Sequence, residues 1–138
     1  MNTNISLLNK YWTDIYFYLH YTHKEKISHQ AVRILQLVEK EKNVGVNEIA
    51  LYIQVSHNTA SEHVKRLIEK EYLIKSRQPL DERKVILSLS DLGKEVLYRY
   101  TSLDEEKLAK IFLELNEDDK KVIEQALKIL SEQAKKCM

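Results

Sequence analysis

Residues 47–89, NEIALYIQVSHNTASEHVKRLIEKEYLIKSRQPLDERKVILSL, change their hydrophobic period partway along. As far as about Lys70, apolar residues recur at steps of three and four, which is the spacing of amphipathic helices. From Tyr72 onwards they alternate with polar residues, which is the period of strands. This stretch therefore predicts helices followed by a two-stranded hairpin.

The helical part is expected to contain two helices joined by a tight turn. Asn47 is placed to cap a short first helix, and Ser56 to cap a second helix that ends near Lys70. Gln54 and Val55 form the turn between them. One side of the second helix is apolar and suited to burial, through Ala60, Val64, Leu67 and Ile68.

The opposite side of the second helix is polar. Its amide, hydroxyl, carboxylate and cationic groups can form hydrogen bonds with base edges in the major groove of DNA. An ordinary solvated helix face has the same composition, so this helix alone does not decide between the two interpretations. The residues that we predict to contact DNA from this helix are Ser56, His57, Asn58, Thr59, Ser61, Glu62, Lys65 and Arg66.

The hairpin favours DNA binding. Its connection, Gln78 to Lys84, is expected to be a projecting polar loop, from which long cations reach phosphates or a narrow minor groove. Asp81 precedes Arg83 by two residues and can hold its guanidinium by a charge-assisted bond. Helix, turn, helix and hairpin together outline a winged helix-turn-helix. The predicted DNA contacts of the wing are Arg77, Asp81, Arg83 and Lys84.

The remainder of the chain is expected to be helical. Between Ile5 and Leu19 apolar residues again recur at steps of three and four. Aromatic side chains widen this face so far that a second subunit is expected to cover it. Further helices are expected after Ser28, after Ser90 or Asp91 with a break near Thr101-Ser102, and after Asn116.

Composition and motifs bound the classes of function. Two Gly and one Pro in 138 residues argue against an all-β fold, which needs many tight turns. The chain has no glycine-rich phosphate loop, no Gly-x-Ser-x-Gly and no paired-cysteine site, so we expect no enzyme and no cofactor. The net charge of +1 leaves only a mild basic bias in residues 56–84, so the case for nucleic acid rests on pattern.

The same data bear on where the protein works. No apolar run approaches the length of a membrane span, and the residues from Met1 to Asn4 show no signal-peptide pattern. Cys137 is the single cysteine, which is compatible with a reducing compartment. We therefore expect a cytoplasmic protein that does not enter a membrane.

The run from Val44 to Val96 resembles the winged helix-turn-helix of the MarR family of bacterial regulators. Asp81 and Arg83 match the family's wing signature, and Leu89-Ser90-Asp91-Leu92-Gly93 matches its strand-to-helix exit of the Leu-Thr-x-x-Gly type. Ile27 to Gln30 resembles the start of the family's second helix. The resemblance implies a homodimer built by the first, fifth and sixth helices. It also implies recognition helices in successive major grooves, wings in flanking minor grooves, and a pseudo-palindromic operator.

Two residues depart from the family pattern. Glu62 stands on the recognition helix where the family often has Arg, and Glu71 stands where Gly commonly precedes the first wing strand. Glu62 has two interpretations: it accepts a hydrogen bond from a cytosine amine, or it pairs with Arg66 one turn further on. Because both interpretations of Glu62 are possible, the residues of the recognition helix do not predict the operator sequence.

The resemblance also implies a small aromatic effector, bound between the dimer helices and the winged part. Tyr11, Trp12, Tyr16 and His20 are the candidates to line that pocket, although an aromatic stripe equally suits a core or an interface. No cysteine lies near the N-terminal helix, which argues against thiol sensing. Histidines 20, 23 and 29 give only a weak zinc signal, so we predict no metal site.

Together these observations predict a mainly α fold with a small β-wing (α+β), a winged helix-turn-helix flanked by N- and C-terminal dimerisation helices. Within a single domain, 1–138, the DNA-binding part is 28–90 and the dimerisation part is 1–27 with 91–138. The predicted function is sequence-specific regulation of transcription by a homodimeric repressor that an effector releases. The alternative is a winged helix that binds protein instead of DNA. That alternative predicts a wing without arginine and exposed apolar anchors on the helix.

Overall fold

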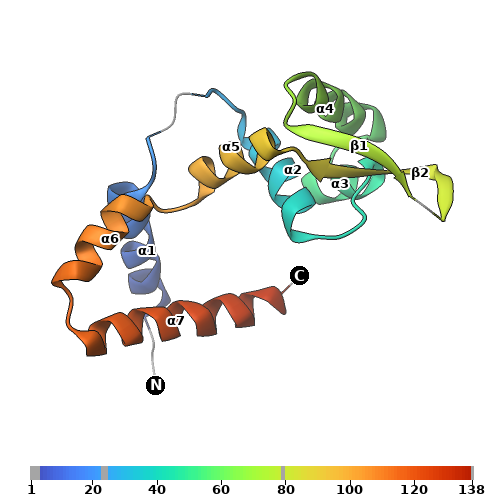
Figure 1. The fold of residues 1–138 in the computed structure, drawn as a ribbon. Coiled ribbons are helices and arrows are strands. Elements are labelled where there is room, and N and C mark those ends of the chain that lie inside the picture. The colour runs from blue at the N-terminus through green and yellow to red at the C-terminus, as the bar shows by residue number, and fades with distance from the viewer. Residues whose placement is uncertain (1–3, 23–24, 79, 138) are drawn as a thin grey trace. The chain divides into compact units, whose positions relative to one another are not determined.

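The computed structural model describes residues 4–22, 25–78 and 80–137. His23 and Pro79, which entered the sequence argument, lie outside these ranges. The chain divides into two compact units, one formed by Met1–Leu19 with Leu103–Met138 and the other by His20–Ser102. The first unit is helical, and the second combines helices with a two-stranded antiparallel sheet (Figure 1), which confirms the mainly α fold with a β-wing.

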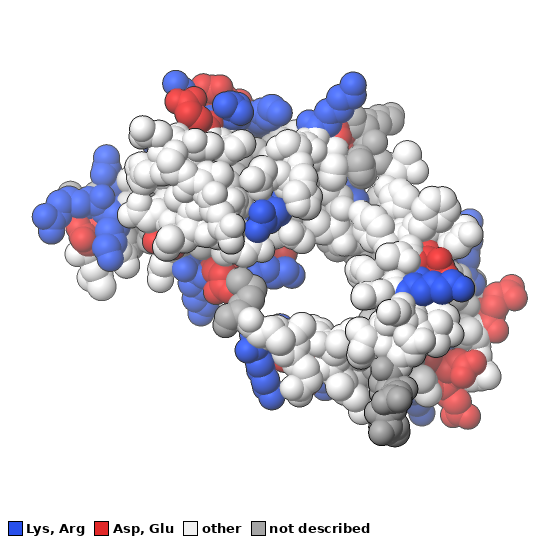
Figure 2. Space-filling model, turned by 180° about the vertical axis from the view of Figure 1, so that it is seen from behind, with Lys and Arg blue, Asp and Glu red and all other residues white. Residues whose placement is uncertain are grey.

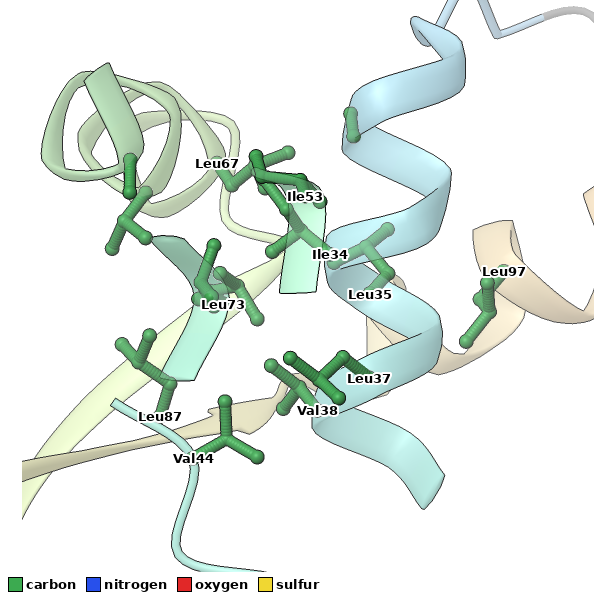
Figure 3. Close-up of a cluster of buried hydrophobic side chains, with 14 residues drawn as sticks. Ile34, Leu35, Leu37, Val38, Val44, Ile53, Leu67, Leu73, Leu87 and Leu97 are labelled. Atoms are coloured by element: carbon green, nitrogen blue, oxygen red, sulfur yellow. The ribbon is translucent and has the colours of Figure 1, made fainter. Parts of the chain in front are cut away.

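The His20–Ser102 unit contains a winged helix-turn-helix and the helix that follows it. Buried aliphatic side chains fill the space between its helices and the sheet (Figure 3). Ile34, Leu35 and Ile49 are fully buried there, and each such side chain contributes about 1.5–3 kcal/mol by leaving water. The elements of this unit are α2 (His29–Lys40), α3 (Val46–Ile53), α4 (His57–Glu69), β1 (Leu73–Gln78), β2 (Asp81–Leu89) and α5 (Asp91–Thr101).

Three serines cap helices of this unit, as expected. The hydroxyl oxygens of Ser28, Ser56 and Ser90 each accept a hydrogen bond from the backbone N–H three residues further on, at 2.9–3.1 Å. Each bond satisfies a donor that the first turn of a helix cannot pair internally. These caps place the starts of α2, α4 and α5 as the sequence predicts.

Helix α3 begins earlier than expected. Gly45 stands at its N-cap, and the Gly45 N–H donates to Glu48 Oε1 at 2.7 Å. A Cβ at Gly45 would lie 3.0 Å from the carbonyl oxygen of Val85, so glycine allows the close approach of the chain to β2. The predicted cap at Asn47 is wrong because this packing against the wing, which local sequence does not reveal, sets the start of the helix.

The turn between α3 and α4 lies where the sequence predicts it. Gln54 ends α3 in the left-handed conformation with φ 58°. The next N–H, of Val55, donates to the carbonyl oxygen of Ala50 at 3.0 Å. This reversal in two residues turns the chain directly into the cap of α4.

The strands of the wing are longer than expected. Strands β1 and β2 pair with Leu73 opposite Leu89 at the base and Gln78 opposite Asp81 at the tip. The expected loop from Gln78 to Lys84 is therefore wrong over most of its length, since β2 already begins at Asp81. Of the residues 81–84 the register pairs only Asp81, opposite Gln78, and a register shift separates this pair from Arg77 opposite Val85. Residues 82–84 are therefore an irregular part of β2, which the polar composition does not distinguish from a loop.

Glu71, the residue that precedes the wing, adopts φ 66°. This is the left-handed region, which glycine enters at no steric cost and other residues enter at a cost of about 1–2 kcal/mol. The Glu71 N–H donates to the Ile68 carbonyl at 2.9 Å and the next N–H, of Tyr72, donates to the Leu67 carbonyl at 2.9 Å. These bonds close the end of α4 and hold the unfavourable conformation.

The segment that enters α2 is attached to the end of α5 within the same unit. Arg99 Nη1 lies 2.9 Å from Glu25 Oε1, and the Tyr100 hydroxyl donates to the Glu25 carbonyl. The Ile27 N–H in turn donates to the Tyr100 hydroxyl oxygen at 3.2 Å. The path of the chain before α2 is thus determined by side chains that lie more than seventy residues away.

The other unit consists of α1 (Ile5–Leu19), α6 (Glu105–Glu114) and α7 (Glu117–Lys135). Asn116 caps α7 as expected, its Oδ1 accepting from the Asp119 N–H at 2.7 Å. The expected break near Thr101-Ser102 separates α5 from α6. None of the residues of these three helices, all of which are described, is buried. Within the described residues, no helix is both long and apolar enough to cross a membrane.

Candidate nucleic-acid interface

Helix α4 is held to the unit by its apolar side. Ala60, Val64 and Leu67 are buried in the core cluster. The remaining circumference of the helix carries polar and charged residues, and the core contacts fix which of them face outwards. Among the predicted contacts on α4 and at its cap, the exposed ones are Ser56, His57, Asn58, Thr59, Ser61, Glu62, Lys65 and Arg66.

Two of these residues are engaged in capping. Ser56 Oγ accepts from the Thr59 N–H at 3.1 Å and donates to Thr59 Oγ1 at 3.0 Å. Their hydroxyls therefore stabilise the first turn of α4, and their freedom to contact a base is reduced. In the described part of the chain, Asn58, Ser61 and Glu62 have no such engagement.

The wing presents an arginine that is oriented by a carboxylate. Arg83 N–H donates to Asp81 Oδ1 at 3.1 Å, and Arg83 Nε lies 3.4 Å from the same oxygen. The predicted contact between these two residues is thus present. The Arg83 side chain is 94% exposed, so the Asp81 contact orients it without burying it. Arg77, on β1, and Lys84, on β2, are exposed on the same hairpin.

A cavity of about 410 Å³ is lined by the start of α4, by the segment that leads into α3 and by the wing. His57 and Lys84, predicted from different parts of the sequence, both line it. Asn43, Asn47 and Gln78 line it as well, and sequence reasoning did not assign them to the interface. No local signal marks these three residues, because they meet only when the wing folds against the segment that precedes α3.

Charge is unevenly distributed over this unit. In Figure 2 Lys and Arg project at the wing end of this unit, with an acidic side chain among them. Strands β1 and β2 carry four Lys and Arg and two Asp and Glu, whereas α4 carries two of each sign. The acidic residues of α4 are Glu62 and Glu69. The local excess of cations at the wing suits contacts with phosphates, and the mixed face of α4 suits contacts that distinguish one base from another.

The predicted effector residues belong to different parts of the chain. Tyr11, Trp12 and Tyr16 lie on α1, and His20 lies at the start of the other unit. The rings of Trp12 and Tyr16 lie 6.5 Å apart between centroids. No group of three or more potential metal ligands occurs among the residues that the structure describes.

Comparison of the sequence with known proteins gives a family. A model of the transcriptional regulators SarA and Rot matches residues 17–100. The HTH-type transcriptional regulator SarZ of Staphylococcus aureus is 22% identical over 79 residues, which are 57% of this chain and 53% of SarZ. The chain thus spans about half the length of the curated relatives that it matches. The matched proteins are transcription regulators and not enzymes.

Solved structures share the fold. MepR of Staphylococcus aureus, bound to ethidium bromide, has a TM-score of 0.63 and 18% identity, over 95% of this chain and 97% of MepR. Streptococcus pneumoniae FabT in complex with DNA has a TM-score of 0.59 and 19% identity, over 98% of this chain and 100% of FabT. ZitR of Lactococcus lactis, a zinc-responsive MarR family member, has a TM-score of 0.53 and 22% identity, over 93% of this chain and 96% of ZitR.

The family model covers more than half of the chain, and the architecture is that of solved winged-helix regulators such as the MarR family member ZitR. The resemblance inferred from residues 44–96 is thereby confirmed. The chain belongs to the SarA/Rot family of transcriptional regulators, and it shares its fold with the MarR family member ZitR.

Proposed function

We propose that the chain is a sequence-specific regulator of transcription that binds double-stranded DNA. In this proposal α4 enters the major groove and the wing reaches the adjacent minor groove. The observation that carries it is the combination, within one compact unit, of an exposed polar face on α4 and an arginine that Asp81 orients on the wing. The DNA complex of FabT, which has the same fold, supports this assignment.

The two surfaces have different tasks in the proposal. Arg83, Lys84 and Arg77 supply cations that displace counterions from phosphates, which makes affinity depend steeply on salt. Asn58, Ser61 and the other exposed residues of α4 supply the directional groups that base edges require. The cavity lined by His57 and Lys84 connects the two surfaces, so they can follow one DNA backbone.

The proposal includes a homodimer. Helices α1, α6 and α7 expose large apolar side chains, among them Phe17 at 69% and Leu130 at 67%. Large apolar side chains exposed to this extent on three helices are costly in water, and a second copy of the same helices would cover them. A two-fold axis would present two α4 helices to half-sites about 34 Å apart, which requires a pseudo-palindromic operator.

The proposed mode of regulation is repression. A dimer that covers a promoter blocks transcription, and an effector that favours another arrangement of the dimer releases it. We propose a small aromatic molecule as the effector, with Tyr11, Trp12, Tyr16 and His20 as the residues to test first. Support comes from the ring contact between Trp12 and Tyr16 and from MepR, whose structure holds ethidium bromide.

The test of DNA binding is selection of bound duplexes from a random pool, followed by affinity measurements across a salt series. An enriched inverted repeat, with log affinity falling steeply against log salt, is the expected result. If no sequence is enriched and binding to random duplex is absent at low salt, the proposal is wrong. The winged helix would then be a protein-binding module.

A further inference from the structure

Glu62 occupies the centre of the exposed face of α4. At about 100° per residue it lies about 160° around the helix from both Ala60 and Val64, which are buried against the core. Asn58 and Thr59 precede it by one turn, and Lys65 and Arg66 follow by one turn. When α4 enters a groove with its buried side outwards, the residue opposite that side reaches deepest towards the base edges.

The Glu62 carboxylate is not engaged by its cationic neighbours. The ion pairs among the described residues do not include Glu62, Lys65 or Arg66. Of the two interpretations that the sequence left open, the pair with Arg66 is therefore not formed. This leaves a charged hydrogen-bond acceptor at the middle of a surface that would face polyanionic DNA.

The chemistry of base edges restricts what such a group can contact. An ionised carboxylate only accepts hydrogen bonds. In the major groove guanine and thymine present acceptors, adenine presents a donor beside an acceptor, and cytosine presents its N4 amino donor. A carboxylate is thus attracted by cytosine and repelled by the acceptors of guanine and thymine. At adenine the carboxylate is attracted by the N6 amino donor and repelled by the N7 acceptor.

We propose that Glu62 is the residue that selects a C·G pair at one fixed position of each half-site, by accepting a hydrogen bond from cytosine N4. The inference rests on the proposed DNA binding and adds a specificity determinant to it. Because the carboxylate is also repelled by phosphates, it lowers affinity for DNA in general. Glu62 therefore increases the specificity of the protein mainly by lowering its affinity for sequences without cytosine at that position.

The test compares the selected DNA sequences of four proteins: the wild type, Glu62→Gln, Glu62→Ala and Glu69→Gln. Glu69 is an exposed glutamate at the C-terminal end of the same helix, so its substitution removes the same charge from α4 without removing the central acceptor. We expect the wild type and Glu69→Gln to prefer cytosine at one position of the half-site by about tenfold over the other bases.

The variants at position 62 should change that position alone. Glu62→Gln should admit adenine, because an amide both donates to N7 and accepts from N6, and Glu62→Ala should lose the preference. Affinity for random duplex should rise in Glu62→Gln and Glu69→Gln, since each removes one negative charge. Thermal melting of all four proteins checks that the fold is unchanged.

The outcomes separate this inference from the proposed function. If the wild type enriches an inverted repeat and the base preferences of Glu62→Ala equal those of the wild type, the inference is wrong while DNA binding stands. If Glu69→Gln alters the same position as strongly as Glu62→Gln, the effect is one of charge and the inference is again overturned. If the wild type enriches nothing, both fail.

Discussion

The carboxylate of Asp81 contacts Arg83 twice, through the backbone N–H at 3.1 Å and through the guanidinium Nε at 3.4 Å. Both residues stand at the start of β2, where the strands pair across a register shift. Asp81 thereby orients a side chain that has almost no other contact with the protein. At such an exposed position the contact adds little to stability, and its effect is to limit the directions that the guanidinium explores.

Replacing Arg83 by alanine is expected to weaken DNA binding broadly. Each wing loses one phosphate or minor-groove contact, so affinity falls for all sequences and the salt slope decreases by about one per wing. Fluorescence anisotropy of a labelled duplex over a salt series measures both quantities. Arg83→Lys, which keeps the charge, should retain most of the salt slope. Unchanged affinity and slope in Arg83→Ala would show that the wing does not contact DNA.

Asn58→Ala and Thr59→Ala are expected to act differently although the residues are adjacent. The Asn58 amide is exposed and uncommitted among the described residues, so its loss should change the base preference without changing stability. Thr59 Oγ1 accepts from the Ser56 hydroxyl at 3.0 Å, so its loss should reduce stability by about 0.5–1.5 kcal/mol. Sequence selection and thermal melting of both variants distinguish these effects. Equal base preferences for Asn58→Ala and the wild type would contradict the assignment.

Glu71→Gly is expected to stabilise the winged unit. Glu71 has φ 66°, and glycine relieves about 1–2 kcal/mol of steric cost. Part of this gain is lost through the greater entropy of the unfolded chain, which leaves about 0.5–1 kcal/mol. Urea denaturation should show a higher midpoint at an unchanged slope. Glu71→Ala, which keeps the Cβ, is the matched control and should show no gain; a lower midpoint for Glu71→Gly would refute the strain argument.

Leu127→Lys is expected to dissociate the proposed dimer. Leu127 lies on α7 and is 52% exposed, in a run of apolar residues that the proposed second copy would cover. A charge buried at that interface lacks a partner and costs several kcal/mol. Sedimentation velocity at micromolar concentration should give a dimer for the wild type and a monomer for the variant. Gln125→Lys, which adds the same charge to α7, should remain dimeric. A monomeric wild type would refute the dimer.

The parts of the fold that were predictable from sequence are set by short-range chemistry. Ser28, Ser56 and Asn116 each cap a helix with a side chain that bonds to a backbone N–H within three residues. Gln54 and Val55 form a turn that ends one helix directly before the cap of the next. Such signals involve neighbours in the chain, so reading them does not require knowledge of the packing.

The errors arose where distant segments meet. Asn47 is a good cap by its residue type, but the approach of Gly45 to Val85 starts α3 earlier. The polar run after Gln78 has the composition of a loop, but β2 begins within it at Asp81, which pairs with Gln78 across a register shift. At Gly45 a contact with the wing outweighs a local preference, and after Gln78 the pairing of Asp81 extends the strand into a polar run.

The order of the elements, the apolar faces, most of the caps and the family resemblance could be read from the amino-acid sequence, because these follow from residue type and spacing along the chain. The three-dimensional structure was needed to show which polar groups are available at the candidate interface. It commits Thr59 to the cap, leaves Glu62 apart from Arg66, and brings His57 and Lys84 to one cavity. For Thr59 and Glu62 the decision lies in the side-chain conformations along α4. For His57 and Lys84 it lies in the packing of distant segments, because the wing and the start of α4 meet only in the folded unit.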